Sequence, residues 1–178
     1  MPVLEILTHP DPRLREIARP VEVFDAALQQ LIDDMFETMR HAVGVGLAAP
    51  QVGVSKRLVV IDIGRKDGEE WHPDPQVFIN PTIVEADGEL PWKEGCLSVP
   101  GVRAEVVRCA RVVLSYLDRQ GAPQRLEAGG LFAVCIQHEL DHLDGTLYVD
   151  RLPPLEQKLT LQDYERSRAE AAAQSPPP

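Results

Sequence analysis

The segment His138-Glu139-Leu140-Asp141-His142 carries the residue types of a metal site at helical spacing. Residues four apart lie on one face of an α-helix, one turn from each other, so both imidazoles can reach the same metal ion. Glu139 follows the first histidine and can take a proton from water activated at that ion. The alternative is a chance pair whose rings bond to core carbonyls. Because two buried histidines are costly unless they are bonded, the five-residue unit favours a metal site.

The third ligand does not follow from this helix alone. One protease class has a histidine six residues after the second, but Tyr148 stands at that position. A glutamate of the next helix, as in thermolysin-type proteases, would have to be Glu156 or Glu165. Both lie beyond the break at Pro153-Pro154.

Three cysteines compete for the same role. Cys135 lies one turn from His138 on the side away from His142, so we interpret it as a core or pocket residue. Cys109 follows a β-branched run and is typical of a small packed hydrophobe. Cys96 follows a glycine, which lets the backbone approach a ligand closely. Spacing alone does not decide between Cys96 and the other candidates.

A second stretch, Gly44–Gln51, combines glycines and small residues with one amide side chain. Small residues after a helix allow close approach of a backbone or ligand, and Gln51 offers an amide donor. A tight packing turn would have the same composition, so this stretch by itself is a weak indication of a site.

The composition is that of a soluble globular protein. The chain has 178 residues, 44% of them hydrophobic and 26% charged, which suits one domain at about 150 residues per domain. A net charge of −10 disfavours binding to nucleic acid or to an anionic membrane surface. No apolar run approaches the roughly 20 residues of a membrane span. The start Met1–Glu5 is unlike a secretory signal, and three cysteines do not build a disulfide framework, so we expect a cytoplasmic protein with reduced thiols.

Hydrophobic periodicity predicts three helices. The first is expected over Asp25–Met39, with Asp25 as its N-cap. The second, over Leu131–Asp144, carries the histidines and stops at Gly145. Good helix formers predict the third over Leu155–Ala173.

Short β-branched runs predict strands between the first two helices. These runs are Arg57–Ile63, Val77–Ile79, Thr82–Val84, Val102–Arg108, Arg111–Leu117 and Gln124–Glu127. Asn80-Pro81 is expected to interrupt the hydrogen bonding, and the polar stretch Gly64–Pro75 to form a surface loop. We therefore expect an α+β fold, with small antiparallel or mixed sheets around a central metal-binding helix. It forms one domain over residues 1–173, followed by a disordered tail over 174–178.

Three motifs together resemble those of the peptide deformylase family. The family has Gly-x-Gly-(apolar)-Ala-Ala-x-Gln, then Glu-Gly-Cys-(apolar)-Ser, then Gln-His-Glu-x-Asp-His. This sequence has them in that order at Gly44–Gln51, Glu94–Ser98 and Gln137–His142. Ile6–Arg15 and Phe78–Pro81 are also similar to the family, so the resemblance covers about Val3–Arg151.

The resemblance implies a metal ion held by Cys96, His138 and His142, with water in an open fourth position. It implies removal of the formyl group from the N-terminal formyl-methionine of new polypeptides, with Glu139 as the general base. The Gln51 side chain and the Leu97 backbone amide would stabilise the oxyanion.

The resemblance also implies a substrate-binding role for residues around this centre. Val45, Gly46 and Gly95 would hold the peptide extended, Arg103 would lie beside it, and Glu94 would pair with Arg108. The complete set of expected substrate-binding residues is Gly44, Val45, Gly46, Trp92, Gly95, Arg103, Leu131, Val134 and Cys135.

The metal and the partners follow in the same way. Thiolate and imidazole ligands suit zinc, but members of the family resemble one another in using Fe(II), so we expect Fe(II), with Zn(II), Ni(II) or Co(II) as substitutes. The expected partner is a nascent N-formylmethionyl peptide, and we expect a monomer. Some members dock on the ribosome through a basic C-terminal helix. Here that helix is of mixed charge, which puts transient ribosome association in doubt.

The alternatives are a metalloprotease or amidase with another third ligand, and a structural zinc site.

Overall fold

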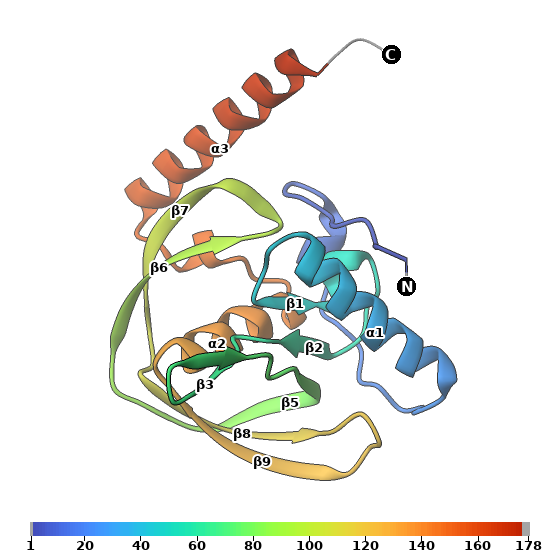
Figure 1. Cartoon of the computed structure of the whole chain (residues 1–178). Coiled ribbons are helices and arrows are strands. Elements are labelled where there is room, and N and C mark those ends of the chain that lie inside the picture. Colours follow the sequence, from blue (N-terminus) through green and yellow to red (C-terminus); the bar gives the residue numbers. More distant parts are fainter. Residues whose placement is uncertain (1, 176–178) are drawn as a thin grey trace.

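The computed structural model describes residues 2–175 and has an α+β fold (Figure 1). An antiparallel sheet with the strand order β1-β2-β5-β8-β9 forms its largest layer. Its strands are β1 (Gly46–Ala48), β2 (Leu58–Ile61), β5 (Gln76–Asp87), β8 (Arg111–Leu117) and β9 (Pro123–Gly129). The hairpins are β3 (Arg65–Asp67) with β4 (Glu70–His72), and β6 (Leu90–Cys96) with β7 (Val99–Arg108).

The three predicted helices are present, with ends close to the expected ones. They are α1 (Ala26–His41), α2 (Gly130–Leu143) and α3 (Pro154–Gln174). Of the short 3-10 turns, η1 (Pro12–Arg15) precedes α1, η2 (Ala49–Val52) follows β1, and η3 (Tyr148–Arg151) lies between α2 and α3. Asp25 caps α1, because its carboxylate accepts a hydrogen bond from the Leu28 amide. Within residues 2–175, no helix has the length and apolar character needed to cross a membrane.

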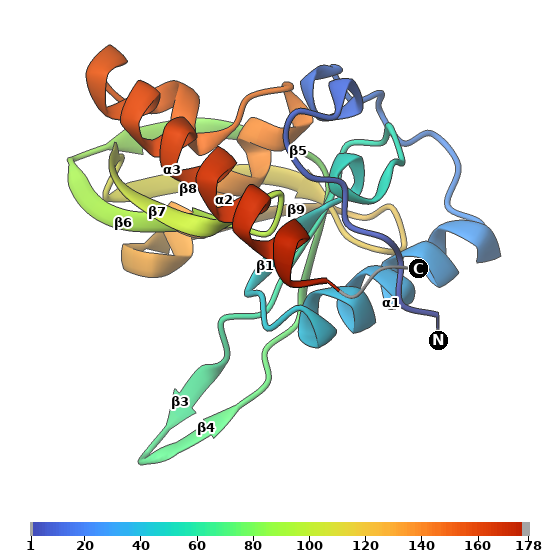
Figure 2. The same cartoon turned by 90° about the horizontal axis from the view of Figure 1, so that it is seen from above.

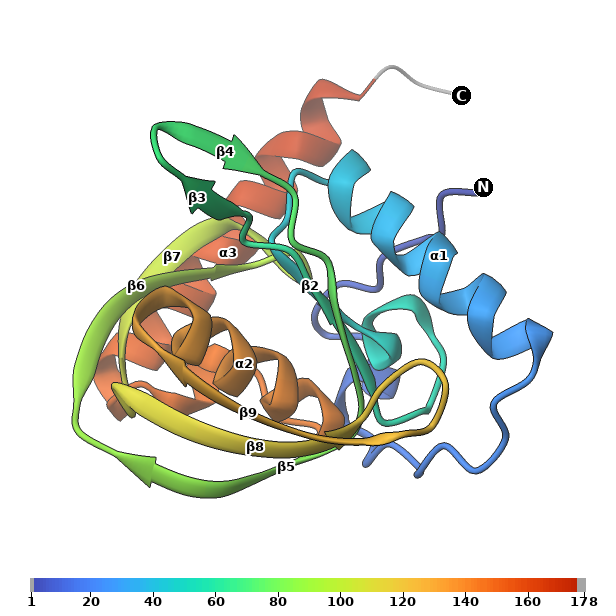
Figure 3. The same cartoon turned by 60° about the horizontal axis from the view of Figure 1, so that its bottom comes forward.

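Helix α2 lies inside the molecule, between the large sheet and the β6–β7 hairpin (Figure 3). Its residues Ile136, Leu140 and Leu143 belong to one core cluster with Phe78 and Leu114 of the sheet. Helix α1 packs on a second cluster that contains the other side chains of the same sheet.

Strand β2 shows why this sheet can carry a helix on each side. Val59 and Ile61 belong to the α2 cluster, whereas Leu58 and Val60 belong to the α1 cluster. All four are fully buried. A strand covered on both faces has a continuous apolar run rather than an alternating one, as its sequence has.

Helix α3 crosses the β6–β7 hairpin and then projects from the body (Figures 1 and 2). Tyr164 is its one buried residue and joins a third cluster with Val99 and Tyr148. The Tyr164 hydroxyl donates a hydrogen bond of 2.6 Å to the carbonyl of His9. Leu161 packs against the same cluster, and the Gln157 side chain donates a hydrogen bond of 3.4 Å to Asp150, so several turns of the helix contact the body.

Parts of the sequence prediction were wrong. The polar stretch Gly64–Pro75 contains the β3–β4 hairpin, which extends away from the body (Figure 2). The runs Val77–Ile79 and Thr82–Val84 belong to one strand, β5, and not to two. The expected interruption of the hydrogen bonding at Asn80-Pro81 is confirmed, because the register with β8 shifts between Ile79 and Thr82 and Asn80 takes a φ of +49°. Strands β1 and β6 were not predicted. Gln174, placed in the disordered tail, ends α3, and residues 176–178 lie outside the described part.

We expect Tyr164→Ala to lower the free energy of unfolding by about 3–5 kcal/mol, because it leaves a cavity and an unpaired carbonyl at His9. Leu159→Ala, on the exposed side of the same helix, should change it by about 0.5 kcal/mol or less. Urea unfolding of both variants measures the two values. Equal losses would show that α3 is not anchored by Tyr164.

Candidate active site

Three side chains that could hold a metal ion converge between α2 and the β6–β7 hairpin. The ligand atoms of Cys96, His138 and His142 all lie within 4.8 Å of one another. The Cys96 Sγ atom is 3.3 Å from the Nε2 atom of His142. In residues 2–175 no other group of three such residues is arranged in this way. The other candidates for the third ligand (Tyr148, Glu156, Glu165, Cys109 and Cys135) are not part of the group.

The turn of the β6–β7 hairpin presents Cys96. Its register shifts between Glu94 and Cys96, so that the chain bulges at Gly95. The Ser98 amide lies 3.4 Å from the Cys96 Sγ atom, and the Ser98 carbonyl accepts a hydrogen bond of 2.8 Å from the His9 amide. These contacts hold the sulfur toward the helix.

A network of buried charges fixes the ring of His138. The Nδ1 atom of His138 is 2.6 Å from a carboxylate oxygen of Glu94, so its Nε2 atom is the ring nitrogen left to face Cys96. Arg108 donates hydrogen bonds of 2.7 and 2.9 Å to Glu94 and one of 2.7 Å to Asp141. Asp141 also accepts from Arg151. The predicted pairing of Glu94 with Arg108 is thus present.

The buried groups of this network have shifted pKa values. Burial by itself would lower the pKa of His138, but its contacts with Cys96 and Glu94 raise that pKa well above the ordinary value. Burial by itself would raise the pKa of Glu94, but its contacts with His138 and Arg108 hold that pKa below the ordinary value. Burial, and then the neighbouring charge of His138, lower the pKa of His142 well below its ordinary value. A neutral imidazole is the form of histidine that binds a metal ion.

Glu139 lies beside the metal-ligand group with one carboxylate oxygen free. It is buried, and its Oε2 atom has no hydrogen-bond partner in residues 2–175. Burial, with the nearby charge of Glu94 adding to it, raises its pKa to about 7. A β-carbon on Gly46 would lie 2.5 Å from the Oε1 atom of Glu139, so only glycine leaves room for the carboxylate there.

Gln51 enters the site from η2. Its Oε1 atom accepts a hydrogen bond of 2.9 Å from the Ala48 amide. Its Nε2 atom donates one of 3.1 Å to the Ser98 hydroxyl and lies 3.7 Å from the Cys96 sulfur. The amide is therefore oriented with its donor side toward the metal-ligand group.

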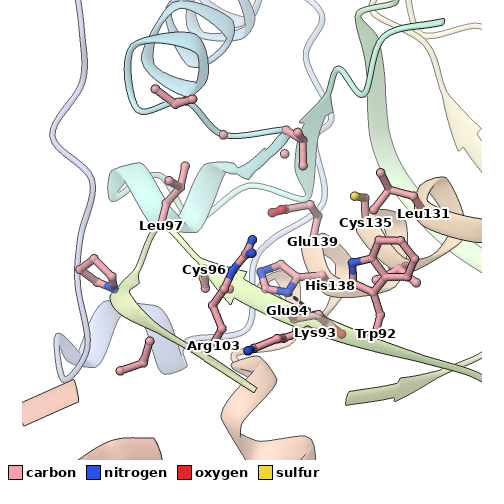
Figure 4. A pocket seen from close by; sticks show the side chains of 18 of the residues that line it. Trp92, Lys93, Glu94, Cys96, Leu97, Arg103, Leu131, Cys135, His138 and Glu139 are labelled. Atoms are coloured by element: carbon pink, nitrogen blue, oxygen red, sulfur yellow. Dashed lines mark hydrogen bonds and ion pairs between the residues drawn. The ribbon is translucent and has the colours of Figure 1, made fainter. Parts of the chain in front are cut away.

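These residues border a cavity of about 1000 Å³ (Figure 4). Every expected substrate-binding residue lines it, as do Gln51, Leu97 and Glu139. His142 is buried behind it. Burial, and then the charges of Glu139 and Glu94, raise the pKa of the Cys135 thiol to about 12, so it lines the cavity as a neutral group.

Sequence reasoning missed some of the lining residues. They are Val43, Lys93, Pro100, Gly101 and Val102. Lys93 and Gly101 lie in strands directly beside the Glu94–Ser98 motif. If the sequence analysis had recognised strand β6, the position of Lys93 next to Glu94 would have indicated that Lys93 lies near the site.

The donor set fits a transition-metal ion, because one thiolate and two imidazoles are the ligands that zinc and similar ions prefer. Three protein ligands leave a coordination position open for water, and Glu139 has a free oxygen beside them. This fold and site define a metal-dependent hydrolase of the class whose helix carries His-Glu-x-x-His.

Comparison with known proteins gives the family. Residues 3–158 match the family model for polypeptide deformylase. A peptide deformylase of Chromobacterium violaceum is 57% identical over 158 residues, which are 89% of this chain and 92% of that protein. The crystal structure of a Legionella pneumophila peptide deformylase is 48% identical, with a TM-score of 0.88, over 98% of this chain and all of that one. The Acinetobacter baumannii enzyme with Met-Ala-Ser bound is 36% identical, with a TM-score of 0.78, over 85% of this chain and 99% of that one.

The chain therefore belongs to the peptide deformylase family, whose members remove the formyl group from the N-terminus of newly made peptides.

If Cys96 is the third ligand, Cys96→Ser should weaken metal binding by about 10–100-fold or more. Substitution of a residue that only hydrogen-bonds to a metal ligand already costs that much affinity. Cys109→Ser should keep the full metal content, because Cys109 lies between β7 and β8, not within a strand as expected, and outside the metal-ligand group. Elemental analysis after dialysis against a weak chelator measures both. Equal metal retention would show that Cys96 is not a ligand.

Proposed function

We propose that the protein hydrolyses the formyl group of N-formylmethionyl peptides at the cavity of Figure 4, releasing formate and a free amine. The observation that carries this function is the position of Glu139. Glu139 lines the same cavity as Cys96, His138 and Gln51, and its Oε2 atom has no hydrogen-bond partner in residues 2–175.

Cys96, His138 and His142 would hold the metal ion. When bound, the ion lowers the pKa of a water molecule and polarises the formyl carbonyl. We propose Fe(II) as the native ion, with Zn(II), Ni(II) or Co(II) as substitutes. The thiolate and imidazole donors suit all of them.

Glu139 moves the proton. Its free Oε2 atom accepts a proton from the attacking water as the new C–O bond forms. When the C–N bond breaks, Glu139 delivers this proton to the leaving amine. A pKa of about 7, raised mainly by burial, suits a group that must both accept and release a proton near neutral pH.

Gln51 and Leu97 would supply donors for the oxyanion. The Ala48 amide holds the Gln51 oxygen, so the Nε2 atom is the end of the side chain that faces the reaction. Leu97 lies in the turn between β6 and β7, next to Cys96, and contributes its backbone N–H. Donors placed where charge develops stabilise the transition state more than the substrate.

The edge of strand β1 would bind the peptide. The Val45 carbonyl accepts a hydrogen bond from the Asp62 amide, so Val45 faces β2. In an antiparallel pair, the next residue directs its N–H and C=O to the other side, and Gly46 therefore offers them at the free edge. An extended peptide can add there as a further strand. Its methionine side chain would occupy the apolar part of the cavity, at Trp92, Leu131, Val134 and Cys135.

We further propose that the protein works as a monomer in the cytoplasm, as one domain over residues 1–173, on nascent chains. The mixed charge of α3, with ion pairs from Arg166 to Asp163 and from Arg168 to Glu165, argues against a strong ribosomal contact through this helix.

Glu139→Gln should lower kcat/KM for formyl-Met-Ala-Ser by about 100-fold to 10,000-fold, because it removes the proton acceptor, while the metal content persists. Glu127→Gln, which removes an exposed carboxylate of β9, should leave both unchanged. Formate release and metal analysis give the two readouts.

The same assay separates the alternatives. Cleavage of an internal peptide bond, with the formyl group untouched, would favour a protease. Loss of folding on chelation, with no activity for any metal, would favour a structural metal site.

Gly46→Ala should lower kcat/KM by about 100-fold, the cost of a displacement near 1 Å, because its β-carbon would push the Glu139 carboxylate aside. Gly129→Ala is the matched control, since a β-carbon there meets only Ala110 at 3.7 Å. An active Gly46→Ala enzyme would show that the carboxylate does not need its observed position.

A further inference from the structure

The cavity has a cationic side as well as an apolar one. Lys93 of β6 and Arg103 of β7 both line it. Figure 4 shows Arg103 rising beside Cys96, with Lys93 extending toward its base, whereas Trp92, Leu131 and Cys135 gather at the other end of the view. The apolar end suits the methionine side chain. Arg103 is expected to lie beside the peptide, but no group of the substrate has been assigned to its charge or to that of Lys93.

Both cations are free of protein partners. Neither side chain forms an ion pair or donates a hydrogen bond to any group in residues 2–175. Glu105 stands opposite Lys93 in the β6–β7 register, yet the two are not ion-paired. The acidic side chains that line the cavity do not pair with these two cations either. Glu94 is bound to Arg108 and His138, and Glu139 is buried beside the metal ligands.

Arg103 lies close to the reacting centre. A β-carbon built on Gly95 would be 3.1 Å from its Nε atom and 3.3 Å from its Cγ atom, so the side chain crosses the residue next to Cys96. An extended peptide advances about 3.3 Å per residue. The second and third substrate residues follow the methionine by one and two such steps, along the cavity that Lys93 and Arg103 line.

We propose that Lys93 and Arg103 make the enzyme prefer formylmethionyl peptides with an acidic side chain at the second or third position. This preference presupposes the deformylase activity proposed above. In a chain of net charge −10, two unpaired cations at one cavity create a local positive field for such a carboxylate. Both cations are exposed, so the attraction is modest and screened by salt.

The test compares isosteric peptides that differ by one charge. Formyl-Met-Glu-Ser-amide is paired with formyl-Met-Gln-Ser-amide, and formyl-Met-Ala-Glu-amide with formyl-Met-Ala-Gln-amide. Amidation removes the terminal carboxylate, which would otherwise bind the same cations. The metal-loaded enzyme should favour the glutamate peptide of at least one pair by about twofold to tenfold in kcat/KM at low salt, mainly through KM. The ratio should fall toward one at about 1 M salt, where the Debye length is about 3 Å.

Variants assign the preference to the two side chains. Lys93→Gln and Arg103→Gln should each reduce the glutamate-to-glutamine ratio, and together bring it to about one. Lys93→Glu should favour glutamine over glutamate. Lys158→Gln, on α3 outside this cavity, makes the same change in net charge and should keep the wild-type ratio. The ratio is internal to each variant, so a partial loss of folded enzyme does not alter it.

The outcomes are distinct. Equal kcat/KM within both peptide pairs for the wild-type enzyme would overturn the preference while leaving the deformylase activity intact. An acidic preference that survives in the double variant would overturn the assignment to Lys93 and Arg103. No formate from any peptide, formyl-Met-Ala-Ser-amide included, would overturn the proposed function and the preference with it.

Discussion

The site depends on one buried guanidinium. Arg108 of β7 bonds both to Glu94 of β6 and to Asp141 of α2, so it joins the hairpin that bears the cysteine to the helix that bears the histidines. Glu94 lies two residues before Cys96, and Asp141 directly precedes His142. The same ion pairs therefore set the spacing of thiolate and imidazoles. A buried ion pair adds little net stability, since desolvation offsets the attraction, and its value here is geometric.

Glu139 lies in the same buried region, but its carboxylate forms no ion pair with the described residues around it. Its neighbours on α2 are held by charge, while its own carboxylate lies against the open backbone of Gly46 and keeps one oxygen without a protein partner. Burial without an ion pair raises its pKa to about 7, whereas Glu94, buried but doubly bonded, has a lowered pKa. Two glutamates of one site thus take opposite roles, one fixed as a charge and one free to exchange a proton, because only one of them has cationic partners.

The sequence pattern correctly predicted features that depend on residues close together in the chain. These are the two histidines one helical turn apart, the Asp25 cap and the buried run of β2. Choosing Cys96 as the third group required a contact between residues 46 apart in sequence, which spacing within one helix does not reveal. Strand β6 was hidden because Pro91, Lys93 and Gly95 are poor strand formers held in place by their pairing with β7. Lys93, which lies in that strand, was missed for the same reason.

The C-terminal helix reaches the site through the body of the protein. The Tyr164 hydroxyl holds the His9 carbonyl, the His9 amide holds the Ser98 carbonyl, and the Ser98 hydroxyl accepts from the Gln51 amide. Each step is a hydrogen bond of 3.1 Å or less. The buried side of α3 is thereby linked to the side chain that faces the reacting carbonyl. The charge on its exposed side takes no part in these contacts, so a helix of mixed charge can serve the site as well as a basic one.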